Sequence, residues 1–355
     1  RLKEEGACVI GKTNMDEFGF GTFCTNSGYE VPRNPHDQDR VVGGSSGGAA
    51  ALTAALDYPH IALAESTGGS ISAPAAFCGV VGVTPTYGRV SRHGLIDYGN
   101  SLDKIGAMST SVYGAALGLD IIAGEDEQDQ TTVDRPAGFA DDLNATVDGM
   151  RIGVPQQYLR FDGLDDAVRE RFDEAMATLE DAGATVEQVD MEKLSREYAV
   201  PAYYIIAVSE ASTNLARYCG MRYGAEGDPS GNGFNDYFAG VRSEHFGDEV
   251  KRRIMLGTYA RMAGYREQYY LKALKVRRLI IDEFREAFTD YDLLASPAMP
   301  ITAPTFDEAA ELSPAEVYAM DTLTVGPNLA GMPHASVPMG RVEGMPTGLH
   351  LIGDH

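Results

Sequence analysis

Hydrophobic positions along the chain follow two spacings, one typical of short buried strands and one typical of helices. Short apolar runs predict strands at 7–10, 61–64, 80–83, 151–154, 185–189 and 291–295, then a strand, a Gly turn and a strand from residue 335 onward. Apolar residues at helical spacing predict helices at 47–56, 71–78, 112–123, 164–182, 202–218 and 257–288. This alternation predicts an α/β fold with a mixed central β-sheet covered by helices on both faces.

Two polar stretches interrupt this pattern: 124–148 is either a linker or a surface excursion, and 224–236 is an acidic, Gly-rich loop. A length of 355 residues suits one large domain, so residues 1–355 are expected to form a single domain. The chain begins as if in the last turn of a helix and stops just after an apolar strand. We therefore expect this domain to be truncated at both ends.

The charge is strongly acidic, because 52 Asp and Glu outnumber 29 Lys and Arg to give a net charge of −23. Such a chain repels phosphate backbones, so direct binding of nucleic acid is not expected. An acidic, lysine-poor surface is also typical of proteins adapted to high salt, and a basic partner is the alternative interpretation. A hydrophobic fraction of 44% excludes disorder, and no apolar run reaches the roughly 18 residues that span a membrane.

The four cysteines, Cys8, Cys24, Cys78 and Cys219, have no spacing typical of a zinc site or a disulfide framework. We expect free buried thiols, no metal and a cytoplasmic location.

Two segments fit known functional sequence patterns without the structural context that those patterns require. Residues 6–13 (GACVIGKT) fit the phosphate-binding loop pattern, but the predicted strand lies inside the motif instead of before it, so nucleotide binding is not expected. Residues 43–47 (GGSSG) fit the nucleophile elbow of α/β-hydrolases, which needs a partner histidine. His93, His245, His334 and His350 are available, and none has a sequence context that selects it.

Two Gly-Gly-Ser clusters are more informative, because Ser45 and Ser70 lie 25 residues apart and each cluster precedes a predicted helix. Glycines at such turns let backbone N–H groups converge, which is what an oxyanion hole requires. Two hydroxyls are then able to face each other, one as nucleophile and one as proton relay. Two ordinary Gly-rich turns are the alternative.

These clusters also carry a resemblance. The chain resembles the amidase signature family in two stretches, GGSSGGAAAL and the later STGGSISAPAAFCGVVGVTPTYGRVSRHG. Within that family, the chain is most similar to the A subunits of glutamyl-tRNA(Gln)/aspartyl-tRNA(Asn) amidotransferases. Four further stretches carry this similarity: GKTNMDEFGFG, NSLDKIG, EVKRRIMLGTYA and PNLAGMP. The resemblance runs from end to end of the chain.

The resemblance implies a Ser–cis-Ser–Lys triad on an α/β fold. Ser70 matches the nucleophile and Ser45 the serine after a cis peptide, while Ser46 supports the turn. The backbone at Thr67, Gly68 and Gly69 matches the oxyanion hole.

For the substrate, the resemblance implies three residues that bind glutamine. Asp321 matches the partner of the α-ammonium, Arg253 the partner of the α-carboxylate and Tyr203 a pocket-lining residue.

The implied function is hydrolysis of glutamine, with ammonia passed to a partner subunit that converts Glu-tRNA(Gln) to Gln-tRNA(Gln). Implied partners are the B and C subunits of the amidotransferase, with tRNA bound only through the partner and no membrane. No cofactor is implied for this chain, whereas ATP and Mg belong to the partner subunit.

The chain departs from the family near the nucleophile. Ser66 stands where the family usually has Asp, Ser72 where it has Arg, and Thr84 where it has Lys. Losing an acid and a base together suggests one lost ion pair, for which Glu65 is a candidate compensation.

The catalytic lysine of the family matches neither Lys3 nor Lys12 and is expected upstream of this chain, so residues 1–355 alone should lack efficient amidase activity. A stand-alone amidase for another amide, and a non-catalytic scaffold protein, remain alternatives.

Overall fold

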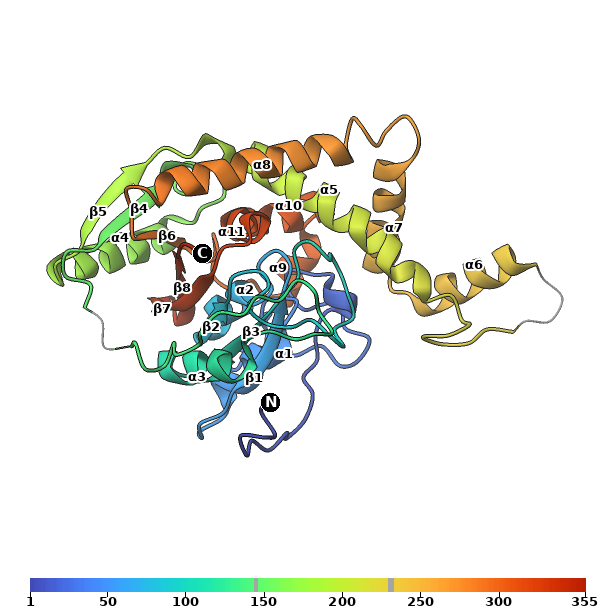
Figure 1. The fold of residues 1–355 in the computed structure, drawn as a ribbon, viewed down its shortest axis with the longest axis horizontal. Coiled ribbons are helices and arrows are strands. Elements are labelled where there is room, and N and C mark those ends of the chain that lie inside the picture. The colour runs from blue at the N-terminus through green and yellow to red at the C-terminus, as the bar shows by residue number, and fades with distance from the viewer. Residues whose placement is uncertain (144–145, 229–232) are drawn as a thin grey trace.

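The computed structural model describes residues 1–355 except 144–145 and 229–232 (Figure 1). Its centre is one mixed sheet in which β4 is parallel to β5 and β6, and the other neighbouring strands pair antiparallel. The strand order is β1-β3-β2-β7-β8-β6-β4-β5. The strands are β1 (Ala62–Ser66), β2 (Val81–Thr84), β3 (Lys104–Ser109), β4 (Arg151–Pro155), β5 (Thr185–Val189), β6 (Leu293–Pro297), β7 (His334–Val342) and β8 (Met345–Ile352).

Helices pack on both faces of this sheet, which confirms the predicted fold class. One face carries α3 and α4, and the opposite face carries α1, α2, α8 and α11. The helices are α1 (Gly47–Ala55), α2 (Ser72–Cys78), α3 (Val112–Ile122), α4 (Asp166–Asp181), α5 (Arg196–Asn214), α6 (Phe234–His245), α7 (Asp248–Arg261), α8 (Tyr270–Ala287), α9 (Phe306–Glu311), α10 (Pro314–Ala319) and α11 (Val325–Ala330).

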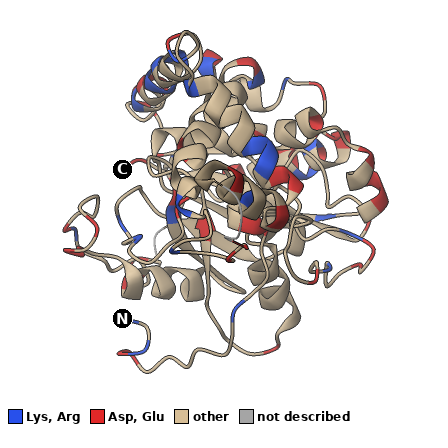
Figure 2. Ribbon diagram, turned by 90° about the vertical axis from the view of Figure 1, so that its right-hand side faces the viewer, with Lys and Arg blue, Asp and Glu red and all other residues tan. Residues whose placement is uncertain are grey.

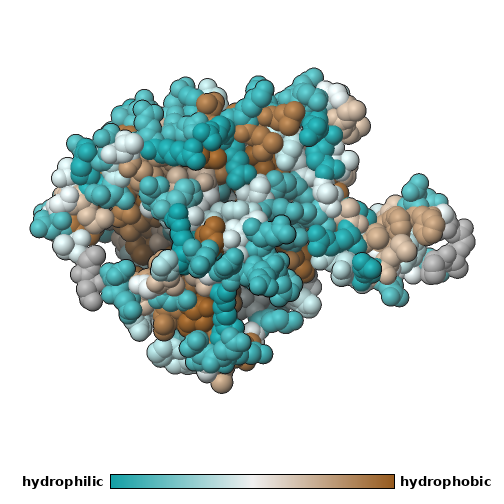
Figure 3. Space-filling view, in the orientation of Figure 1, coloured by the Kyte–Doolittle hydropathy of each residue, from teal (hydrophilic) through white to brown (hydrophobic). Residues whose placement is uncertain are grey.

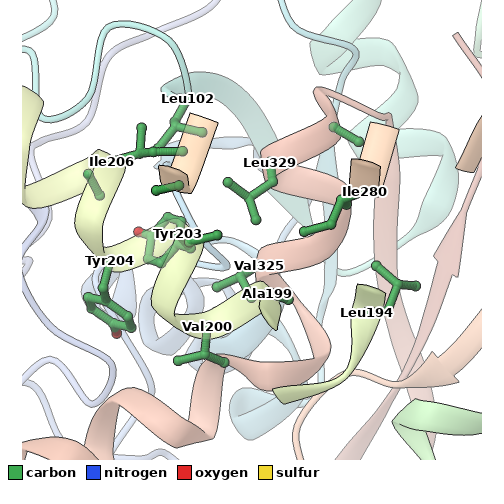
Figure 4. Packing of buried hydrophobic residues seen from close by; sticks show 14 of the residues in the cluster. Leu102, Leu194, Ala199, Val200, Tyr203, Tyr204, Ile206, Ile280, Val325 and Leu329 are labelled. Atoms are coloured by element: carbon green, nitrogen blue, oxygen red, sulfur yellow. The ribbon is translucent and has the colours of Figure 1, made fainter. Parts of the chain in front are cut away.

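The largest hydrophobic cluster joins α5, α8 and α11 above the sheet (Figure 4). Ile206 of α5, Ile280 of α8 and Leu329 of α11 are fully buried in it, and Tyr203 belongs to it with 3% of its surface exposed. Burying side chains of this size contributes about 1.5–3 kcal/mol each. This packing fixes α5, which carries Tyr203, against the rest of the molecule.

Most predicted strands and helices are present, but helices α6, α9, α10 and α11 were not predicted, and three other segments also differ. Residues 7–10 form no strand, and Val9 and Ile10 are 68% and 64% exposed, because no described strand pairs with this segment. The predicted helix 257–288 is two helices, α7 and α8, separated by a turn that contains Gly264 with φ +87°. Strand β3 was not predicted, since its sequence KIGAMS lacks β-branched alternation.

The described part of the stretch 124–148 contains neither helix nor strand. The stretch 224–236 falls partly outside the described residues, and its end opens α6, which projects from the body (Figure 1). Figure 3 shows a mostly hydrophilic face on which this projection carries apolar surface, including Phe234 at 73% exposure.

Acidic residues are spread over helices and loops in the view of Figure 2, consistent with the net charge of −23. No helix among the described residues combines the length and the apolar character needed to cross a membrane.

Candidate active site

The turn that carries Ser45 has the predicted conformation, because the Gly44–Ser45 peptide is cis. Buried Asp16 holds it: the Asp16 N–H donates to the Ser45 carbonyl at 3.1 Å, and the Asp16 carboxylate accepts from the N–H groups of Cys24 (3.0 Å) and Asn26 (2.8 Å). A Cβ on Gly44 would lie 2.2 Å from Asp16 Oδ2, so only glycine fits there. Burial raises the pKa of Asp16 to about 7.

Backbone contacts join this turn to the segment that carries Ser70. The Ser46 N–H donates to the Ser70 carbonyl at 3.3 Å, and the Ser46 hydroxyl donates to the Glu65 carbonyl at 3.0 Å. Ser46 thus supports the turn, as expected. The Ser45 hydroxyl is fully buried and has no hydrogen-bond partner in the described part of the chain. It is therefore available for a proton transfer.

Ser70 lines a narrow pocket at the junction of α2, α5, α7 and the segment before α11. The three residues assigned to glutamine by resemblance, Tyr203, Arg253 and Asp321, all line it, although 118 positions separate the first from the last. The remaining lining residues are Gly19, Gly21, Gly44, Gly68, Gly69 and Tyr204.

Arg253 is a buried cation, 3% exposed, whose guanidinium lies over the rings of Phe20, Tyr98, Tyr204 and Tyr318 at 5.2–5.7 Å. Its Nε donates to Glu249 Oε1 at 2.7 Å and its Nη1 donates to the Tyr98 hydroxyl at 2.6 Å. A surface role for this arginine is excluded. These bonds use two of the five guanidinium N–H groups, so one on Nη1 and both on Nη2 remain for a ligand carboxylate.

Asp321 is the second charged residue of the pocket, and its Oδ2 accepts from the Tyr204 hydroxyl at 2.5 Å and from the Thr22 hydroxyl at 3.4 Å. Burial raises the pKa of Asp321 to about 6, although the hydrogen bond from Tyr204 and the charge of Arg253 oppose this shift. Sequence reasoning missed Tyr204, for which adjacency to Tyr203 was the one available signal. Its stacking on Tyr318, with ring centroids 4.1 Å apart, fixes its hydroxyl at Asp321.

The predicted oxyanion residues divide into two kinds. Gly68 and Gly69 line the pocket, and neither has room for a side chain: a Cβ on Gly68 would lie 2.3 Å from the Tyr203 ring, and one on Gly69 would lie 2.2 Å from Thr324 Oγ1. The Thr67 side chain points away from the pocket. The oxyanion role of these three backbone positions stays a prediction.

The Thr67 hydroxyl bridges two carboxyl groups, at 2.7 Å from Glu65 Oε1 and 2.8 Å from Asp103 Oδ1. A hydroxyl has one proton to donate, so one of the two carboxyl groups must be protonated to bond with it. Burial raises the pKa of Glu65, with a further increase from Asp103, and it raises the pKa of Asp103 to about 7. Sequence reasoning missed this bridge, although Asp103 lies in the quoted NSLDKIG stretch.

The departures at Ser66 and Ser72 lie in buried surroundings. Glu65, the candidate compensation for the lost ion pair, accepts from the Thr67 hydroxyl and forms no ion pair among the described residues, so its compensating role stays a prediction. Ser72 instead contacts His334, with its Oγ 3.1 Å from Nδ1, and Ser66 Oγ is buried without a partner among the described residues.

The segments 6–13 and 43–47, which fit two sequence patterns, form neither a phosphate-binding loop nor a hydrolase elbow. Residues 6–13 are exposed, with no helix among them or directly after them. None of the four candidate histidines makes a described contact with Ser45: His334 bonds Ser72 and His350, and His245 lies beside Glu244.

The expectation of buried thiols is right for Cys24 and Cys78 but wrong for Cys8, which is exposed, and for Cys219, which is half-buried; all four are free. Among the described residues, no group of three His, Cys, Asp or Glu is placed to hold a metal ion.

Comparison with known proteins adds an independent line of evidence. The family described as Amidase matches residues 1–355. The A subunit of glutamyl-tRNA(Gln) amidotransferase from Natronomonas pharaonis is 51% identical over 99% of this chain and 82% of that protein. Its counterpart from Methanococcoides burtonii is 49% identical over 100% of this chain and 73% of that protein.

Solved structures of related proteins share the fold of this chain. The crystal structure of the corresponding A subunit from Thermotoga maritima has a TM-score of 0.83 at 41% identity, over 100% of this chain and 71% of that one. A bacterial aryl acylamidase has a TM-score of 0.80 at 25% identity, over 99% of this chain and 70% of that one.

Proposed function

Because the chain belongs to the amidase family, we propose that it is the glutamine-hydrolysing subunit of a tRNA-dependent amidotransferase. The observation that carries this proposal is the pocket in which Ser70, Tyr203, Arg253 and Asp321 come together. A cation and an anion facing one small pocket match the carboxylate and ammonium of a free amino acid. An amidase for an uncharged amide has no use for that pair. The names of the relatives support the same substrate.

In the proposed reaction, Ser70 Oγ attacks the side-chain amide carbon of glutamine, and backbone N–H groups at Gly68 and Gly69 stabilise the resulting oxyanion. Ser45 takes the Ser70 proton and relays it, through a basic group, to the departing nitrogen. The C–N bond breaks and ammonia leaves, with glutamyl ester left on Ser70. Water then cleaves the ester and restores the hydroxyl. The family uses a lysine as the basic group, and Ser45 Oγ is the atom it would meet.

Asp321 and Arg253 would hold the substrate at its α-carbon end. The Asp321 carboxylate pairs with the α-ammonium, and Arg253 Nη2 donates to the α-carboxylate. Tyr204 keeps Asp321 in place, and Glu249 with Tyr98 keeps Arg253 in place.

The assembly is part of the proposal. Ammonia passes to a larger partner that binds ATP, Mg and tRNA, and a further small subunit completes the complex in the cytoplasm. A net charge of −23 supports this division, because a polyanionic tRNA is repelled by this chain.

The proposal is tested by ammonia release from glutamine by the complete gene product, with and without its partner subunits and charged tRNA. Ser70→Ala should lower the rate about 10⁴-fold or more, since it removes the nucleophile. Ser243→Ala is the matched control, because Ser243 is an exposed residue of α6 that does not line the pocket, and it should keep wild-type activity. Release from other amides but not from glutamine would indicate a stand-alone amidase. Release from no amide by the complete, folded protein would indicate a scaffold role.

A further inference from the structure

Positive charge is concentrated in one stretch of this acidic chain, residues 251–278, which run from α7 through the turn after it into α8. The stretch holds nine of the 29 Lys and Arg and one of the 52 Asp and Glu, which leaves 20 basic and 51 acidic residues elsewhere. An acidic partner is therefore repelled by the rest of the chain and attracted to this stretch.

Some of these charges are exposed to solvent. Arg266, Lys272 and Lys275 are exposed and form no ion pair with any residue that the structure describes, whereas Arg278 nearby pairs with Asp282 at 2.9 Å. Helix α7 and the turn that leads to α8 lie at the periphery of the molecule (Figure 1). A partner is therefore able to reach these side chains.

Aromatic and apolar side chains are exposed among these charges. Tyr259, Tyr265 and Tyr269 form one cluster with ring centroids 4.7–6.1 Å apart, and each residue is 37–46% exposed. Met255 and Met262 of the same stretch are 72% and 51% exposed. Tyr, Met and Arg are the residues enriched where proteins bind each other. Rings that pack on one another are also not spread out to stack on single bases, so a protein fits this surface better than RNA.

Helix α7 links this stretch to the pocket, because its two sides have different surroundings. Arg253, Gly257 and Ala260 are buried on the inner side, and Arg253 lines the pocket. Met255 and Tyr259 lie on the outer side and are exposed. A protein bound to the outer side is separated from the pocket by one helix, about 10 Å across. Ammonia released in the pocket then has a short way to that protein.

We propose that the exposed face of residues 251–278, here called the α7–α8 surface, binds an acidic face of the subunit that receives ammonia. This inference rests on the proposed function, which supplies that partner. Charge attraction speeds the encounter of the two subunits, and the covered tyrosines and methionines supply affinity. Like charges repel the same partner on other faces of this chain, so the basic stretch also selects the orientation of the complex.

The first test measures association of the complete gene product with its partner subunits by surface plasmon resonance. Lys272→Glu/Lys275→Glu should lower the association rate constant about tenfold at about 0.1 M salt. The difference should vanish at about 1 M salt, where the Debye length falls to about 3 Å. Lys3→Glu/Lys12→Glu is the matched control, because both lysines are exposed and the net charge changes equally; it should associate at close to the wild-type rate.

The second test removes one ring of the tyrosine cluster. Tyr265→Ala should raise Kd for the partner about 30-fold, as expected for a tyrosine at the centre of an interface. Tyr29→Ala is the matched control, because Tyr29 is 84% exposed and lies outside the stretch, and its Kd should equal that of the wild type. Circular dichroism confirms that each variant is folded, and Lys272→Glu/Lys275→Glu keeps the proposal testable if Tyr265→Ala does not fold.

Partner binding like that of the wild type at about 0.1 M salt, in either folded variant of the α7–α8 surface, would contradict the proposal. Loss of tRNA binding or of self-association in these variants, with partner binding unchanged, would assign the surface to RNA or to a second copy and would also overturn it. Glutamine hydrolysis without the partner should be unchanged in both. A wild-type protein that binds no partner subunit would contradict the proposed assembly, whereas binding that survives both variants contradicts this inference alone.

Discussion

At the residue scale, the sequence identified the residues proposed to react with or bind the substrate, but not the residues that keep those side chains in position. Ser70, Tyr203, Arg253 and Asp321 were found by resemblance, and the structure brings them to one pocket. Tyr204, which bonds Asp321, was not found. A hydrogen bond between residues 117 positions apart leaves no local pattern in a sequence.

The pKa of Asp321 leads to a pH prediction. Asp321 binds an ammonium group only when ionised, so KM for glutamine should rise about tenfold per pH unit below its pKa of about 6. In Asp321→Asn, KM should be higher by about 10–100-fold at about pH 7.5, the effect of removing one charged hydrogen bond, and it should lose this acid dependence.

Tyr204→Phe distinguishes positioning from simple packing. The Tyr204 hydroxyl lowers the pKa of Asp321, so its removal should move the midpoint of the KM profile to higher pH while the fold is kept. A profile unchanged from wild type in both variants would refute the assignment of Asp321 to the α-ammonium.

At the element scale, strands and helices with strong periodicity were predictable, and those set by tertiary packing were not. Strand β5 has its predicted bounds, 185–189. Strand β3 was missed because Gly106 and Ala107 break the pattern, since close packing against Ile71 and α3 requires small residues there. Residues 7–10 show the reverse error, an apolar run without a partner strand.

Close packing between α5 and the Ser70 segment gives a second prediction. Gly68→Ala would place a methyl group 2.3 Å from the Tyr203 ring, so the ring or the loop must shift. A displacement of about 1 Å at a reacting group lowers kcat about 100-fold. The measurement is kcat for glutamine hydrolysis by the complete gene product.

Gly28→Ala is the matched control, because a Cβ there has nothing within 4 Å, and its kcat should equal that of the wild type. A Gly68→Ala enzyme with wild-type kcat would show that the Tyr203 contact does not position the nucleophile.

At the scale of the whole molecule, the fold class followed from alternating elements, but the strand order did not. Strands β7 and β8, near the end of the chain, lie at the centre of the sheet between β2 and β6. Only the packing of distant segments decides such an order. The same insertion places His334 and His350 beneath α2, which is why their contacts had no signature in the sequence.

The net charge of −23 also acts on the molecule as a whole. Repulsion among surface carboxylates destabilises the folded state, and added salt screens it. Sodium gluconate raised from about 0.1 M to about 2 M should therefore increase Tm by several degrees, because repulsion between charges beyond the Debye length is removed. A Tm that stays constant or falls over this range would contradict a role for charge repulsion.

The proposed function depends above all on a covalent ester between Ser70 and the side-chain carbonyl of glutamine. A glutamine analogue with a diazoketone in place of the amide labels such a nucleophile, and peptide mass spectrometry of the complete gene product locates the label. We expect one label per chain, on Ser70, and protection by glutamine. A label on another residue, or no label on a folded protein that releases ammonia, would contradict this mechanism.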